Sequence, residues 1–66
     1  MLRIEIHIKG RITPQWSEWF GGLSIEPSGP DGTILQGMVA DQAALYGIIA
    51  RLRDLGLRLV EVRSEE

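Results

Sequence analysis

His7 is the single imidazole of the chain, and Glu5 and Lys9 share its side of any strand that alternates. A neighbouring carboxylate can orient an imidazole as a general base or a metal ligand. Either chemistry also needs a nucleophile or a second ligand beside the ring, and the sequence pattern supplies neither. We therefore predict that His7 lies on a solvated face, and that the chain has no catalytic residues, no metal site and no cofactor.

Three aromatic residues form the heaviest apolar cluster of the chain. Trp16, Trp19 and Phe20 are spaced three and four residues apart, which places their rings on one side of a short helix. Beside Gly21 and Gly22 such rings could cover a small ligand. A domain this small needs large side chains to close its core, so we expect a mainly structural cluster with Trp19 at an interface.

The basic residues raise the question of nucleic-acid binding. In RNA-binding domains with a ferredoxin-like sheet, exposed aromatic residues on the strands stack on bases. No aromatic residue falls on the predicted strands here, Glu5 and Glu61 interrupt the positive charge, and the net charge is -2. The basic residues that fall largely on one sheet face are Arg3, Lys9, Arg11, Arg58 and Arg63. We therefore do not expect this face to bind nucleic acid.

The first strand is predicted over residues 2–12 by strict alternation of apolar and charged residues. Gly10 lies on the apolar side of this strand, where another element could approach closely. A hairpin should follow, with strands at 23–25 and 33–39 joined by a six-residue loop at 27–32 that is rich in proline and glycine.

Two helices are marked by their end signals. Thr13 and Pro14 favour the start of a short helix that Gly21 and Gly22 end. Asp41 favours the start of a long amphipathic helix that runs to Leu55 and ends at Gly56. At the end of this helix Asp54 opposes the helix dipole, so we expect it to pair with Arg51 or Arg58.

The last strand, predicted over 58–63, contains two adjacent apolar residues that alternation must place on opposite faces unless the strand bulges. We assign Val60 and Val62 to the core side. Leu59 would then join Ile34 and Met38 as an apolar group on the outer side of the sheet, which is typical of a partner-binding surface. Residues 64–66 are expected to fray.

The predicted elements make a single α+β domain over residues 1–66. The expected architecture is a two-layer sandwich: a four-stranded, mainly antiparallel sheet with one long helix and one short aromatic helix. The order βαββαβ matches the split βαβ pattern of a ferredoxin-like fold. The alternative is a meander plus a helix, because the short segment is brief for a crossover.

Composition agrees with a small folded domain. Hydrophobic residues make up 44% and charged residues 24% of the 66 residues. The chain has no cysteine, which is compatible with a reducing compartment, so we expect a cytoplasmic protein. The N-terminal segment alternates charged with apolar residues, and we expect neither an export signal nor a membrane span.

Three segments carry a family resemblance: W-x-x-W-F-G-G-L from Trp16, D-Q-A-A-L-Y-G from Asp41, and R-D-L-G-L from Arg53. They resemble a group of short, uncharacterised bacterial proteins with W-x-x-W-F-x-G-L, D-Q-A-A-L-H-G and I-R-D-L-G-L segments. This chain departs from the group at Tyr46, where histidine is frequent, and at Leu52, where isoleucine is frequent. The resemblance implies a bacterial, intracellular setting and points to one helix side, formed by Gln42, Tyr46 and Arg53, as a contact surface.

From these observations we expect a small non-enzymatic interaction module. It would form a homodimer through the outer face of the sheet, or act as an adaptor that holds a larger protein with Trp19, Tyr46 and Arg53. The alternative hypothesis is a regulatory domain that binds a small molecule in a pocket between the aromatic helix and the sheet. The complete candidate interface is Ile34, Met38, Leu59, Trp19, Tyr46 and Arg53.

Overall fold

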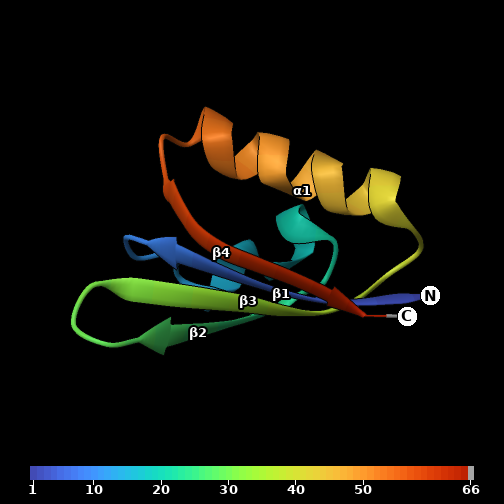
Figure 1. Cartoon of the computed structure of the whole chain (residues 1–66). Coiled ribbons are helices and arrows are strands. Elements are labelled where there is room, and N and C mark those ends of the chain that lie inside the picture. The colour runs from blue at the N-terminus through green and yellow to red at the C-terminus, as the bar shows by residue number, and fades with distance from the viewer. Residues whose placement is uncertain (66) are drawn as a thin grey trace.

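The computed structural model describes residues 1–65. Four strands form one sheet in the order β2-β3-β1-β4, and each strand is antiparallel to its neighbours. The long helix α1 and the short helix η1 cover one side of this sheet (Figure 1). The predicted two-layer α+β sandwich is thus confirmed, with elements β1 (Leu2–Lys9), η1 (Pro14–Phe20), β2 (Ser24–Ser28), β3 (Gly32–Val39), α1 (Gln42–Asp54) and β4 (Arg58–Glu65).

The ferredoxin-like pattern fits in part. β1 and β2 run in the same direction with β3 between them, so the chain crosses over β3 after the first strand. The crossing element η1 is a 3-10 helix and not an α-helix. Since a 3-10 helix rises about 2 Å per residue, its seven residues reach further than the same length of α-helix would. All neighbours are antiparallel, as in the alternative meander, but β1 lies between β3 and β4.

The core lies between the sheet and the two helices. β1 alternates as predicted and sends Leu2, Ile4, Ile6 and Ile8 into the core. β3 adds Leu35 and Val39, and α1 adds Leu45, Ile48 and Leu52. Phe20 of η1 is fully buried among them. The buried polar side chain of Thr33 is satisfied, because its hydroxyl donates a hydrogen bond of 2.5 Å to the carbonyl of Gly10.

Both ends of α1 agree with the sequence signals. The Asp41 carboxylate accepts a hydrogen bond of 2.9 Å from the Ala44 N–H, as an N-cap does. Gly56 has a φ of +75°, and the N–H of Leu57 donates to the carbonyl of Leu52 at 3.2 Å. This is a Schellman motif, in which glycine adopts the left-handed conformation at little cost. Leu55 caps the helix and is exposed, so it falls outside the buried stripe.

The aromatic helix differs from its prediction in two respects. It is a 3-10 helix, with the Trp16 N–H donating to the Thr13 carbonyl at 3.1 Å, and the Thr13 side chain makes no cap. Its three rings pack edge to face, with centroids 5.5 Å apart for Trp16 and Trp19 and 5.0 Å apart for Trp19 and Phe20. They do not share one environment, because Phe20 is buried whereas both tryptophans are 41% exposed.

The hairpin loop is shorter than predicted. Pro27 and Ser28 belong to β2 and pair with Thr33 and Gly32 of β3, which leaves a three-residue turn at 29–31. Arg11 holds this turn, since its guanidinium donates to the carbonyls of Gly29 and Gly32 at 2.8 Å each. Proline is tolerated in β2 because this strand lies at the edge of the sheet.

The side chains of β4 do not all point to the sides predicted for the last strand. Leu59 pairs with Ile8, and Glu61 pairs with His7, so Val60 is the additional residue of a β-bulge. Residues paired across antiparallel strands point to the same side, so Leu59 lies on the core side and the outward assignment is wrong. Val60 is not packed on the core, whereas Val62 is, as predicted.

The C-terminal segment also differs from its prediction. Ser64 and Glu65 extend β4 by pairing with Ile4 and Arg3, so the expected fraying of these two residues is wrong. Glu66, the last residue of the predicted tail, lies outside the described residues. Within residues 1–65, neither helix is long and apolar enough to cross a membrane.

Candidate functional site

The candidate site is the outer face of the sheet, the side opposite α1 (Figure 1). Its residues follow from the registers of the three strand pairs, because partners across antiparallel strands share a face. The four strands contribute Arg3, Glu5, His7 and Lys9; Ser24, Glu26 and Ser28; Ile34, Gln36 and Met38; and Arg58, Glu61, Arg63 and Glu65. Four of these are Arg or Lys and four are Glu, so this face carries balanced charge.

The charges of β1 and β4 form two opposite pairs at one end of the strands, whereas Lys9 and Arg58, which are both positive, lie across from each other at the other end. Arg3 lies across from Glu65, and Glu5 lies across from Arg63. Opposite charges at directly paired positions stabilise an antiparallel sheet by a few tenths of a kcal/mol, up to about 1 kcal/mol each. Glu5, Glu61 and Glu65 separate this positive end from the other arginines, so the two strands carry no extended positive field of the kind that attracts a polyanion.

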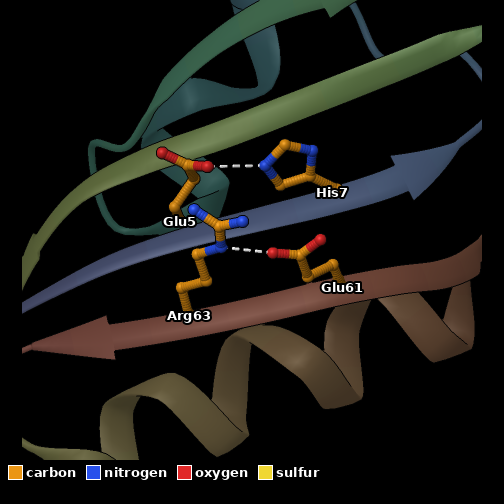
Figure 2. A network of polar contacts seen from close by, with 4 residues as sticks. All are labelled: Glu5, His7, Glu61 and Arg63. Carbon is orange, nitrogen blue, oxygen red and sulfur yellow. Dashed lines mark hydrogen bonds and ion pairs between the residues drawn. The ribbon is translucent and has the colours of Figure 1, made fainter.

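A polar network lies at the centre of the outer face (Figure 2). The Nε2 of His7 donates to a Glu5 carboxylate oxygen at 2.6 Å, and the Nε of Arg63 donates to Glu61. The Arg63 guanidinium extends from β4 toward Glu5. The hydrogen bond from His7 is the main reason that the pKa of Glu5 is lowered, and the charge of Arg63 adds to it. The hydrogen bond to Glu61 raises the pKa of Arg63.

His7 lies on the outer face, as predicted, but half-buried. Its neighbours across the sheet are Ile34 on β3 and Glu61 on β4. Neither neighbour carries a hydroxyl or thiol that the imidazole could activate. The Glu5 and His7 pair therefore places a carboxylate and an imidazole in contact at 2.6 Å on this surface.

One end of the outer face is hollowed. The hollow has a volume of about 430 Å³ and is lined by residues from all four strands: Arg3, Ile4, Glu5, Ser24, Gln36, Gly37, Met38, Arg63 and Glu65. Met38 is 46% exposed there and lies across from Arg3. The hollow thus offers an apolar contact surrounded by charged groups of both signs.

The three residues predicted to form an outer apolar group do not lie on the same face of the sheet. Ile34 and Met38 lie on the outer face, as expected from their spacing on β3. Leu59 lies on the other face, and Val60, which is 64% exposed, borders a second outer hollow together with His7 and Lys9. The adjacent pair Leu59-Val60 was the one sequence signal for this exchange, because two neighbouring apolar residues in a strand are compatible with a bulge.

The predicted adaptor residues are not brought together. Trp19 packs under Arg51, whose guanidinium carbon lies 5.5 Å from the ring centroid, and Arg51 also donates to the Trp19 carbonyl. Residues two apart on an α-helix point in nearly opposite directions, so Arg53 faces away from this contact. Tyr46 is exposed on the side of α1 that carries Arg53.

Within residues 1–65, Asp54 pairs with neither Arg51 nor Arg58, the two partners predicted for it. Asp54 instead lies 3.4 Å from Arg53, in an exposed ion pair. Arg51 borders a further hollow of about 390 Å³ together with Gly21, Met38, Val39, Ala40, Ala44, Gly47 and Ile48. Phe20 of the aromatic helix is fully buried, and this hollow lies at the end of that helix, between β3 and α1.

Comparison with known proteins places this fold in a family. A family model described as Domain of unknown function (DUF8691) matches residues 3–63. The chain belongs to this family. The match extends from Arg3 on β1 to Arg63 on β4, so it covers both helices and nearly the whole sheet of this chain. Searches of curated proteins and of solved structures found no significant match.

Proposed function

We propose that this protein is a non-enzymatic interaction module that binds another protein through the outer face of its sheet. The observation that carries the proposal is the hollow lined by all four strands, with the half-exposed Met38 in its wall. Both helices cover the opposite side, which leaves this face accessible in residues 1–65. An apolar contact ringed by polar groups is the usual layout of a protein interface.

The charged residues that line the hollow indicate which chemical groups a partner should carry. Arg3 and Arg63 offer guanidinium donors for carboxylates, and Glu5 and Glu65 offer acceptors for basic side chains. A polypeptide that carries charges of both signs around one apolar side chain matches this arrangement. A nucleic acid matches it poorly, because half of the charged groups would repel phosphates.

The variant Met38→Glu tests the proposal. Met38 lies across from Arg3, so a glutamate there would be paired and should leave the fold intact, while it removes the apolar contact. We expect the wild-type protein to retain a partner in pull-downs from the native cell, and the variant to lose it at least tenfold. Reconstitution with the purified partner should reproduce the difference.

Tyr46→Glu is the matched control, because Tyr46 is also exposed but lies on α1, away from the sheet. Its binding should equal that of the wild type. Equal retention of the partner by Met38→Glu, or loss by Tyr46→Glu alone, would contradict binding through the outer face. If the captured partner is a second copy of the chain, the face is a self-association surface.

A second candidate function is small-molecule binding in the hollow beside α1. Its support is Arg51, which lines the hollow and could meet an anionic group. We expect a ligand at 100 times its Kd to stabilise the protein by about 2.7 kcal/mol, detectable as a raised Tm. Gly47→Leu, which would fill the hollow, should abolish the shift; an unchanged shift would exclude this hollow.

The setting that we propose for this function is the bacterial cytoplasm. The resemblance of the three sequence segments to short bacterial proteins supports it, as does the absence of cysteine from the chain. Detection of the protein in the soluble cytosolic fraction of a bacterial cell would test this location directly.

A further inference from the structure

β4 is an edge strand with one side that no other strand of residues 1–65 pairs. Edge strands expose backbone N–H and C=O groups that can pair with another chain, and most carry features that prevent this. β2, the opposite edge, is short and contains Pro27. β4 is eight residues long, contains no proline, and is regular from Glu61 to Glu65 beyond its bulge.

The charge pattern of β4 is self-complementary in one register. Two copies of a strand that pair about a two-fold axis place each residue opposite its mirror position along the strand. When the axis passes through Val62, Glu61 of one copy lies opposite Arg63 of the second, and the reverse pair forms as well. Val62 then meets Val62 of the second copy on the side of the sheet that carries the core.

The neighbouring registers are unfavourable. An axis through Glu61 opposes two glutamates, and an axis through Arg63 opposes two arginines and also brings Glu61 against Glu65 on both sides. Like charges directly opposite each other destabilise a sheet. An axis through Ser64 forms Arg63 to Glu65 pairs but overlaps a shorter stretch of the described strand. The alternation of charge and the length of the overlap together select Val62 as the centre.

We propose that two copies of the chain pair through β4, antiparallel and centred on Val62, to form one continuous eight-stranded sheet. The proposal goes beyond the proposed function, because it uses the edge of the sheet and not its outer face. It also enlarges that face: Arg63 lines the hollow of the outer face, and Glu61 of the second copy would lie beside it. The short paired stretch makes this a concentration-dependent dimer.

Charge reversal tests the register. Glu61→Arg and Arg63→Glu each place like charges opposite each other, so each variant alone should remain monomeric in light scattering from micromolar to millimolar concentration. The wild type should double its mean mass over this range. An equimolar mixture of the two variants restores both opposite-charge pairs and should dimerise, and so should the double variant Glu61→Arg/Arg63→Glu.

Glu26→Arg is the control, because it changes net charge as Glu61→Arg does but lies on β2, at the other edge. It should dimerise like the wild type, and circular dichroism should show that every variant is folded. A wild type that stays monomeric at millimolar concentration would overturn the proposal. So would a dimer that survives Glu61→Arg, or a mixture of the two single variants that stays monomeric. Met38→Glu should dimerise normally, which separates this test from that of partner binding.

Discussion

At the scale of single residues, neighbouring side chains of the outer face shift one another's pKa values. Glu5 accepts a hydrogen bond from His7 and lies across from Arg63, so its ionised form is favoured in the folded state. Arg63 in turn is held by Glu61. The contact of Arg63 is exposed and that of His7 is partly exposed, so each contributes little to stability, but together they order the side chains of the outer face.

The lowered pKa of Glu5 predicts a dependence of stability on pH. A carboxyl group whose pKa is lower in the folded than in the unfolded state stabilises the fold above its ordinary pKa of 4.5. This contribution is lost as the pH falls through the lower, folded value. We expect Glu5→Gln to lose less stability than the wild type between pH 7 and pH 3, measured by urea unfolding. Equal losses for the two proteins would contradict this role of Glu5.

At the scale of elements, α1 has well-capped ends but a glycine in its middle that lowers its helix propensity. Asp41 and Gly56 define the ends of the helix through hydrogen bonds that are local to the chain. Gly47 lies in its middle, where glycine costs up to about 1 kcal/mol relative to alanine. A Cβ built at this position would meet no atom within 4 Å, so packing within the molecule does not require the glycine.

Gly47→Ala should therefore stabilise the protein by about 1 kcal/mol, because alanine favours the helix and fits the open space. Thermal and urea unfolding of the two proteins would measure the difference. Ala50→Gly, at an interior position of the same helix, is the reciprocal control and should destabilise it by a similar amount. A loss of stability in Gly47→Ala would mean that another group approaches the helix at this point.

At the scale of the whole molecule, one thin core must support the fold. A domain of this size rarely has more than about 3–5 kcal/mol of stability. Phe20 links η1 to the sheet and is fully buried, and Trp19 joins the same helix to α1 through Arg51. The aromatic helix therefore closes the layer beside α1 and does not form a separate lid.

Phe20→Ala should remove about 3–5 kcal/mol, which is enough to unfold most of the protein at 25 °C. Trp16→Ala is the matched control, since Trp16 belongs to the same helix but is 41% exposed. It should cost clearly less and leave a folded protein with a lower Tm. Circular dichroism and urea unfolding would distinguish the two, and an equal cost would contradict the central place of Phe20.

The sequence alone determined the features that depend on neighbours along the chain. The alternation of β1 predicted which of its residues enter the core, and Asp41 and Gly56 predicted the ends of α1, because caps bond residues only a few positions away. Alternation along β3 likewise predicted that Ile34 and Met38 share the outer face. The need for a large buried ring in so small a core favoured a structural role for Phe20.

Only the tertiary structure decided the features that depend on contacts between elements. The adjacent Leu59 and Val60 are compatible with a bulge, but only the pairing of β4 with β1 decides that Leu59 lies on the core side and Val60 is the additional residue. The packing of Trp19 against Arg51 joins η1 to α1, two elements that are far apart in the sequence. The edge position of β4 likewise follows from strand order, which local patterns do not encode.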